Sequence, residues 1–160
     1  MFRSRRIAFA AGALLAALTV AGCSMTVHLE PADDANHPAC ADISVLLPDS
    51  VADLDRVWTD AQATGAWGEP SVVLRCGVAP PAPSELVCTT IGGVDWLVLD
   101  QEAERQRLVT YGREPAVEIS IKRGEEFDFA TVVDEIAKNI QSGLAPATAQ
   151  CTERGVVPSG

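Results

Sequence analysis

Histidine and tyrosine are scarce in this sequence of 160 residues, which has two histidines and one tyrosine. His28 and His37 both precede the region in which apolar residues recur regularly. A general base that works near neutral pH is usually histidine, so a serine–histidine or cysteine–histidine pair has no well-placed base here. The sequence also has no G-x-S-x-G motif, in which hydrolases carry a nucleophilic serine. We therefore disfavour an enzyme that acts through such a nucleophile.

Basic residues are few, with 12 Lys and Arg against 22 Asp and Glu and a net charge of −10. Three of the basic residues lie in the first 22 residues, which contain no acid, so the remainder carries 9 − 22 = −13. Such a polyanion repels phosphate backbones and anionic lipid headgroups. Nucleic acid is excluded as a partner, and any membrane association must come from attached acyl chains.

The apolar run Ile7–Gly22 has 16 residues and is shorter than the ~20 residues that span a bilayer as a helix. Three arginines precede it, and it ends in the small residues Ala21 and Gly22 directly before Cys23, which is typical of a secretory signal. The segment Leu18–Cys23 (LTVAGC) resembles the bacterial lipobox, in which cleavage leaves a lipid-modified cysteine as the new N-terminus. This predicts a signal peptide over residues 1–22 and lipidation of Cys23, with the protein held on the outer face of the cell membrane. An ordinary signal peptide beside an unrelated cysteine is the alternative.

Two export routes fit this leader. Arg5-Arg6 permits the twin-arginine route, but that motif wants an aromatic or apolar residue where Ala8 stands, and Phe9 comes one place late. The general route is favoured, because it delivers an unfolded chain to an oxidising compartment, which suits the cysteines better.

Four cysteines remain after Cys23, namely Cys40, Cys76, Cys88 and Cys151. An even number in an exported chain predicts two disulfides, with three possible connectivities. A zinc site would need closely spaced pairs, whereas the nearest two are 12 apart, so no metal site is predicted. We prefer Cys40–Cys151, which would tie the two ends of the domain, and Cys76–Cys88, which would close a loop with three prolines.

The remainder divides into a spacer, a domain and a tail. Residues 23–36 contain Pro31 and several acids but no apolar period, which indicates a flexible spacer that reaches ~40 Å when extended at ~3.3 Å per residue. Residues 37–151 are predicted to form a single domain, and residues 152–160 are predicted to be a frayed tail.

Three helices are expected within the domain. Cys40, Ile43 and Leu47 fit one helical face that ends at Pro48, with a short strand as the alternative. A second helix is predicted to begin after Ser50 as N-cap and to end before Gly65, with an apolar face over residues 51–61 on which Trp58 is a core residue. The third, residues 129–143, begins after Asp128 and has the apolar stripe Phe129, Val132, Val133, Ile136 and Ile140.

Between these helices the pattern changes to a period of two, which favours strands. Gly92-Gly93 predicts a hairpin turn, and residues 100–106 predict a charged loop. In the last strand, Val117, Ile119 and Ile121 alternate with Glu118, Ser120 and Lys122, which predicts a buried and a solvated face. The other predicted strands cover residues 72–74, 86–91, 94–99 and 107–111. The fold class expected is α+β, an antiparallel sheet with helices packed on one face and disulfides linking its parts.

Two segments, Trp67–Val78 (WGEPSVVLRCGV) and Tyr111–Glu118 (YGREPAVE), resemble signature segments of a family of actinobacterial envelope lipoproteins described as domain of unknown function 3515. The similarity extends over roughly residues 40–151 and includes Trp96 and the placement of the cysteines. The resemblance implies an exported, membrane-anchored protein, and it implies no activity, cofactor or catalytic residue.

Candidate binding residues are the aromatic and arginine side chains near turns and strand ends: Trp67, Arg75, Trp96, Tyr111 and Arg113. Such residues dominate recognition surfaces, although aromatic side chains also commonly fill the cores of small domains. Arg75 is expected to pair internally with a carboxylate such as Glu118, whereas Arg113 is the better contact residue.

The function that the sequence favours is a non-catalytic binding or interaction domain in the cell envelope, with no cofactor and with an envelope protein or a small ligand as its partner. The alternatives are a hydrolase that uses a pair of carboxylates on cell-wall polymers, and an assembly or quality-control factor whose sheet edge pairs with a client strand.

Overall fold

The computed structural model describes residues 26–82, 86–99 and 102–152. The predicted signal peptide, Cys23 and all but the first residue of the predicted tail lie outside these residues. The helices are α1 (Pro38–Leu46), α2 (Phe129–Ile140) and the short 3-10 helix η1 (Gln141–Gly143). The strands are β1 (Thr26–Val27), β2 (Ser50–Val51), β3 (Leu54–Thr59), β4 (Thr64–Trp67), β5 (Val72–Val78), β6 (Val87–Ile91), β7 (Val94–Leu99), β8 (Arg105–Thr110) and β9 (Ala116–Lys122).

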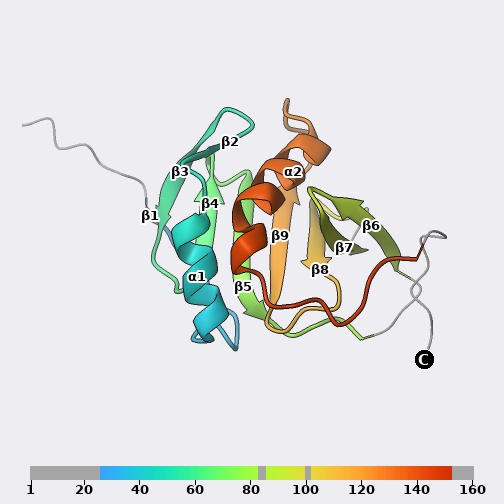
Figure 1. Cartoon of the computed structure of the whole chain (residues 1–160). Coiled ribbons are helices and arrows are strands. Elements are labelled where there is room, and N and C mark those ends of the chain that lie inside the picture. The colour runs from blue at the N-terminus through green and yellow to red at the C-terminus, as the bar shows by residue number, and fades with distance from the viewer. Residues whose placement is uncertain (1–25, 83–85, 100–101, 153–160) are drawn as a thin grey trace, which may run out of the picture.

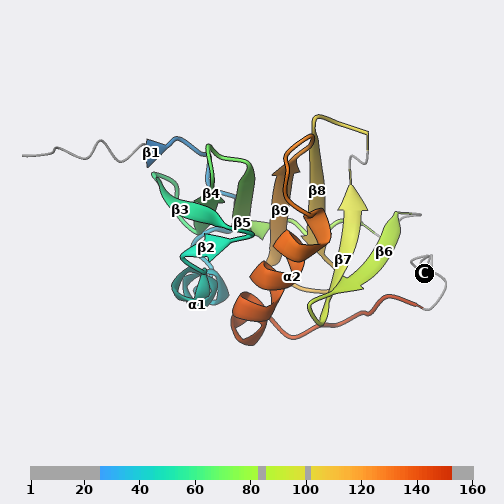
Figure 2. The ribbon, with the colours of Figure 1, turned by 90° about the horizontal axis from the view of Figure 1, so that it is seen from above.

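These strands form one sheet in the order β1-β3-β4-β5-β9-β8-β7-β6, with β2 paired to β3 beside this path. Neighbouring strands run antiparallel except for β1 and β3, which are parallel. β1 therefore lies at one end of the sheet and β6 at the other (Figures 1 and 2). The expected antiparallel sheet with helices is correct, but strands contribute more residues than helices to the described part of the chain, so the fold is mostly β.

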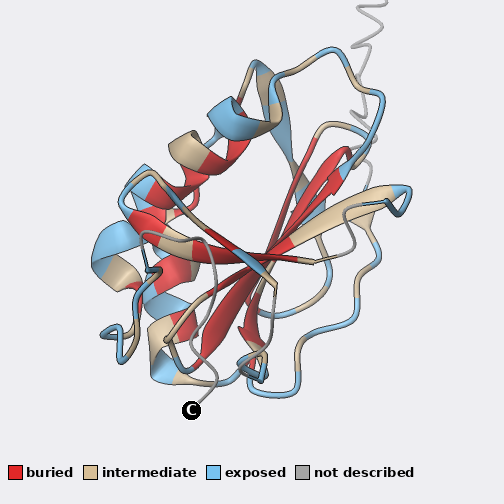
Figure 3. Cartoon of the chain, turned by 90° about the vertical axis from the view of Figure 1, so that its right-hand side faces the viewer, coloured by how far each residue is buried: buried red, intermediate tan, exposed pale blue. Residues whose placement is uncertain are grey.

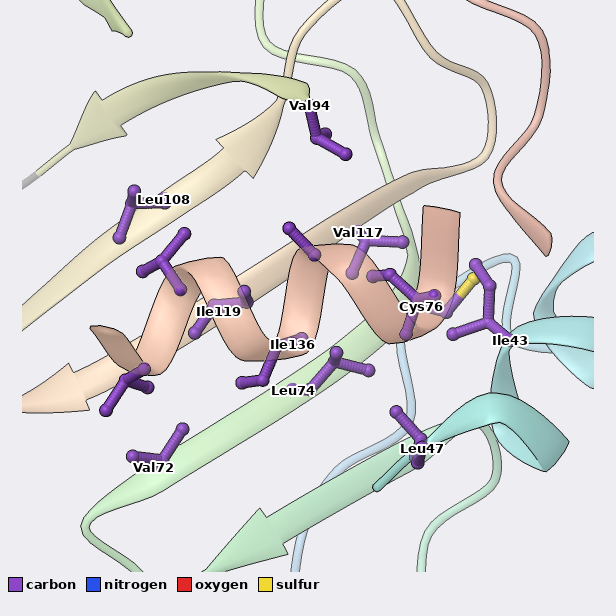
Figure 4. Packing of buried hydrophobic residues seen from close by; sticks show 14 of the residues in the cluster. Ile43, Leu47, Val72, Leu74, Cys76, Val94, Leu108, Val117, Ile119 and Ile136 are labelled. Atoms are coloured by element: carbon purple, nitrogen blue, oxygen red, sulfur yellow. The ribbon is translucent and has the colours of Figure 1, made fainter. Parts of the chain in front are cut away.

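Both helices contribute to one main core. Ile43 of α1 and Ile136 of α2 pack with strand residues such as Leu74 and Ile119 (Figure 4). The buried residues follow the inner strands and one stripe of each helix, while the outer helix surfaces are exposed (Figure 3). In the part of the chain that the structure describes, no helix has the length and apolar character that crossing a membrane requires.

Helix α2 and the β6–β7 hairpin were predicted correctly. Asp128 is the N-cap of α2, since its carboxylate accepts a hydrogen bond from the Thr131 backbone N–H at 2.8 Å. This bond holds the pKa of the Asp128 carboxyl below its usual value. Gly92 and Gly93 both have positive φ and join β6 to β7, as a tight hairpin turn requires. Helix α1 also matches the first predicted helix, whereas β8 begins at Arg105, within the expected loop.

The helix predicted for residues 51–61 is wrong. β2 and β3 form a hairpin in which Val51 lies opposite Leu54. Ala52 and Asp53 between them have φ of 46° and 63°, the left-handed pair that a two-residue hairpin turn uses. Apolar residues three or four positions apart fit a helix and also two short strands that pack on one core, so their spacing alone could not decide.

Two further residues on which that helix prediction relied have different roles. Trp58, a core residue in the predicted helix, lies instead on β3, where its side chain is 74% exposed. Gly65 lies in β4, where a Cβ atom would come within 2.9 Å of the Leu47 and Trp67 side chains. The glycine is therefore required for close packing, and it does not end a helix.

The preferred disulfide connectivity is also wrong. The bridges are Cys40–Cys76 and Cys88–Cys151, with Cα–Cα distances of 5.5 Å and 5.6 Å. Cys76 lies on β5 and Cys88 on β6, and β9, β8 and β7 run between these strands. Four strand spacings of ~4.8 Å place them ~19 Å apart, far beyond the ~7 Å that a disulfide permits.

The segment predicted as a flexible spacer is packed on the domain from Thr26 onward. β1 pairs with β3, with Thr26 opposite Trp58. The Leu29 backbone N–H donates to Asp60 at 2.9 Å, and His28 Nδ1 lies 2.6 Å from the same carboxylate. These two contacts hold the pKa of Asp60 below its usual value. The domain therefore begins about ten residues earlier than predicted.

The same segment is fixed again at Gly77 on β5. The Asp34 backbone N–H donates to the Gly77 carbonyl at 3.1 Å, and Ala35 is buried in the main core. Gly77 has φ of +96°, and a Cβ atom there would lie 2.4 Å from the Asp34 backbone. This close approach requires glycine.

We expect Gly77→Ala to release residues 28–35 from the sheet and to lower the free energy of unfolding by at least ~1–3 kcal/mol, the usual cost of a strained backbone. Urea denaturation and amide hydrogen exchange of residues 28–35 measure the two effects. Gly124→Ala is the matched control, because Gly124 also has positive φ but no atom within 4 Å of the added Cβ. Equal losses in both variants would show that the contact with Asp34 contributes nothing.

Candidate functional site

The polar side chains of β5, β9 and β8 point away from the main core. Arg75 alternates with Leu74 and Cys76, which belong to that core, and Glu118 alternates in the same way with core residues of β9. This face was predicted to be solvated. Glu118 and Ser120 are nevertheless buried, because arginines from the adjacent strands lie over them.

Glu118 is the centre of this arrangement. Its side chain is 6% exposed. Arg75 Nε and Nη2 donate to Glu118 Oε1 at 3.2 Å and 2.6 Å, and Arg107 Nη1 donates to Oε2 at 3.1 Å. The pairing of Arg75 with Glu118, expected from the sequence, is therefore confirmed. Each carboxylate oxygen has an arginine partner, so a buried charge is compensated on both sides.

Arg105 is held by neutral oxygens instead. Its Nε donates to Ser120 Oγ at 2.9 Å, and its Nη2 donates to the Ser120 carbonyl at 3.0 Å. Longer bonds reach the carbonyls of Pro70 and Ser71. Partial burial lowers the pKa of Arg105 from its usual value, while Glu104 and Glu125 act in the opposite direction. Arginine remains charged in proteins, so Arg105 brings a positive charge that none of these hydrogen bonds neutralises.

The arginines and Glu118 line a surface hollow of about 340 Å³, which we call the arginine trough. Its lining residues are Leu29, Glu30, Pro70, Val73, Arg75, Arg105, Arg107, Glu118 and Ser120. Among the described residues that line it, three arginines and two carboxylates give a formal charge of 3 − 2 = +1, in a chain whose net charge is −10. Leu29, Pro70 and Val73 add an apolar wall. The trough therefore offers guanidinium donors beside apolar surface.

Hydrogen-bonding capacity remains in the trough. A guanidinium has five N–H donors, and Arg75 uses only Nε and Nη2 on Glu118. Its Nη1 has no hydrogen-bond partner among the residues that the structure describes, and the side chain is partly exposed. Pre-positioned guanidinium groups are suited to bidentate recognition of a carboxylate or a phosphate.

The predicted binding residues do not meet at one site. Trp67 and Trp96 are fully buried, and their Nε1 atoms donate to the carbonyls of Pro48 and Ile91 at 3.0 Å and 3.2 Å. Both indoles therefore belong to the core, with the polar atom satisfied. Tyr111 packs against a second, smaller apolar cluster around Cys88 and Leu97.

Arg113 lies apart from the trough and is partly buried. Its Nη1 donates to the Ala145 carbonyl, while its buried Nε has no partner among the described residues. Desolvation lowers the pKa of Arg113, and the nearby charge of Asp95 acts against this change. Arg113 thus contacts the chain that leads from α2 to Cys151, and only Arg75 of the five candidates lines the trough.

Arg105, Arg107 and Ser120 were not predicted as site residues. Their signal is a strand alternation: Arg105 and Arg107 are two apart, as are Glu118 and Ser120. Side chains two apart on a strand share a face, so pairing β8 with β9 would have placed the four together. The pairing with β5, which brings Arg75, follows from no local pattern.

Carboxylates gather at a second, shallow hollow beside the start of α2. Its acidic residues are Asp53, Glu125, Glu126, Asp128 and Glu135. Asp128 caps α2 and Glu135 accepts a hydrogen bond from the Ala52 backbone at 2.8 Å, so two of them have structural partners. Over residues 26–82, 86–99 and 102–152, no group of three or more His, Cys, Asp or Glu side chains is arranged to hold a metal ion.

The fold and the trough define a mostly β, disulfide-linked domain with a basic hollow on one face of its sheet. A family model described as "Protein of unknown function (DUF3515)" matches residues 6–148, and the chain belongs to this family. The resemblance expected from residues 67–78 and 111–118 is thereby confirmed for the family. Comparison with curated proteins and with solved structures gave no match.

Proposed function

We propose that the protein is exported, held on the outer face of the cell membrane by a lipid on Cys23, and binds an anionic ligand in the arginine trough without catalysis. Two disulfides within one domain support an oxidising compartment. The leader with its lipobox-like end supports the anchor.

The observation that carries the binding proposal is the excess of guanidinium groups in the trough. Each carboxylate oxygen of Glu118 already has an arginine donor. Within the described residues, the hydrogen bonds of Arg105 go to neutral oxygens, and Nη1 of Arg75 has no hydrogen-bond partner. In a chain that is otherwise strongly acidic, this hollow is where an anion meets attractive charge. The apolar wall favours a carboxylate or phosphate attached to an apolar group.

To test this proposal, the protein is titrated with inorganic phosphate and with succinate, and binding is measured from the NMR signals of the arginine Nε–H groups. We expect the signals of Arg75, Arg105 and Arg107 to shift on titration. Arg75→Lys should weaken binding about tenfold or more while keeping the charge, because a hydrogen bond to a charged group contributes ~1.5–3 kcal/mol and lysine lacks the planar fork.

Arg123→Ala is the matched control. Arg123 is exposed, lies outside the trough, and is held through its backbone N–H to Glu104. This variant removes a positive charge without touching the trough, so its affinity for both probes should stay close to that of the unaltered protein. Shifts spread evenly over all arginines, or equal losses in Arg75→Lys and Arg123→Ala, would rule out a specific anion site.

A further inference from the structure

The distance between the predicted lipid anchor and the folded domain is short. Cys23 precedes Thr26 by three residues, and three residues span at most about 11 Å. Thr26 is fixed in β1, in register with Trp58 of β3. A domain anchored at Cys23 therefore cannot stand ~40 Å from the bilayer, as the spacer prediction required. Its β1–β3 edge must lie close to the headgroups.

An exposed tryptophan lies at this edge. Trp58 is 74% exposed, although a tryptophan side chain can bury about 150–250 Å². Tryptophan is the side chain most characteristic of membrane–water interfaces, where its apolar ring and polar N–H are both accommodated. The residue with the greatest apolar exposure on β3 thus pairs directly with the strand that follows the anchor.

The large exposed apolar residues favour the same end of the molecule. Three such residues occur in the described part of the chain, Trp58, Val45 and Val87. Val45 is 83% exposed and follows Ser44 of α1, which lines the same hollow of about 430 Å³ as Trp58. Val87 is 48% exposed and lies on β6, at the opposite end of the sheet (Figures 1 and 2).

Charge does not attract this edge to a membrane. Asp49, Asp55 and Asp60 lie on or beside β3, with Arg56 as the basic residue among them. Membrane contact must therefore come from the apolar ring, and one ring is too weak to hold a protein at a bilayer alone. The anchor overcomes this by converting the contact into an intramolecular event at high effective concentration.

We propose that the β1–β3 edge is the membrane-facing side of the domain and that Trp58 inserts into the headgroup region of the bilayer. This inference rests on the proposed lipid anchor at Cys23. It fixes the orientation of the domain, with the opposite edge, β6, directed away from the membrane.

The experiment uses the full-length acylated protein in phosphatidylcholine vesicles that carry brominated acyl chains, which quench tryptophan at close range. Trp67 and Trp96 are fully buried and serve as internal references. We expect the brominated lipid to remove close to one third of the emission, the share of one tryptophan among three. Trp58→Phe should abolish this quenching, with an unchanged melting temperature because the ring is exposed.

A second variant, Trp58→Phe combined with Val87→Trp, moves the exposed tryptophan to the far edge and should show no quenching. Flotation with the vesicles is measured on every sample and reports the anchor separately. Flotation without quenching of Trp58 would overturn the proposed orientation and leave the anchor intact. The β1–β3 edge would then be a surface for a protein partner and not for the bilayer. Failure of the acylated protein to float would overturn the anchor and the orientation together.

Discussion

Replacing both Cys88 and Cys151 by alanine is expected to lower the free energy of unfolding by about 4 kcal/mol, because the bridge closes a segment of 63 residues and restricts the unfolded chain. A domain of this size is stable by only ~5–15 kcal/mol. The bridge also fixes the end of the described chain beside β6, where Cys151 packs on the second apolar cluster. The variant should therefore lose a large share of its stability, which chemical denaturation measures directly.

The matched variant is Cys40→Ala with Cys76→Ala, whose bridge closes 36 residues. Chain entropy alone makes its loss about 0.5 kcal/mol smaller, but Cys40 and Cys76 are fully buried in the main core, where the lost sulfur contacts add to the cost. Non-reducing peptide mapping tests the pairing itself. Recovery of a peptide that joins Cys76 to Cys88 would contradict the structure.

The second large effect concerns Glu118. Removing one of its arginines leaves the other, so Arg75→Ala and Arg107→Ala should each be tolerated with a modest loss. Removing both leaves a buried carboxylate without its cationic partners, which costs ~3–5 kcal/mol. The expected result is a double variant that is less stable than the sum of the two single losses, as shown by a double-mutant cycle in urea.

Adding Glu118→Leu to the double variant provides the control. This change removes the unpaired charge, and replacement of a buried ion network by apolar side chains is often neutral or stabilising. The triple variant should recover most of the lost stability. If it is as unstable as the double variant, the arginines stabilise the sheet through packing of their alkyl chains, and the charge of Glu118 is not the cause.

The sequence predicted those elements whose local signals all agree. Helix α2 has a cap at Asp128 and an apolar stripe over three turns, and Gly92-Gly93 can hardly adopt anything other than a turn. Residues 51–61 carried a helical spacing, but Ala52 and Asp53 adopt left-handed conformations that tertiary packing selects. Helix propensity and the spacing of apolar residues do not distinguish a helix from two short strands when both arrangements would bury the same residues.

The site depended on strand order, which local patterns do not contain. Arg75 and Glu118 are 43 positions apart and meet because β5 pairs with β9. Arg107 joins them because β8 lies on the other side of β9. The predicted disulfide pairing is wrong for the same reason. Cys76 and Cys88 are close in the sequence, but they lie on β5 and β6, which three other strands separate in the sheet. The aromatic candidates failed because the sequence does not distinguish a buried indole from an exposed one.

The two bridges do not overlap along the chain: the first closes at Cys76 before the second opens at Cys88. Among the four cysteines after Cys23, each native bond joins two that are consecutive in the sequence. A polypeptide with a lipid-blocked Cys23 that meets an oxidant progressively from its N-terminus would therefore form its native bonds by joining the first cysteine of each pair to the next one to arrive. Interlaced bridges would instead require early, incorrect bonds to be exchanged, which takes seconds to hours at a rate set by the oxidant and by any isomerase present. For a chain exported as proposed, this placement of the cysteines would let oxidation keep pace with delivery, without a later round of thiol reshuffling.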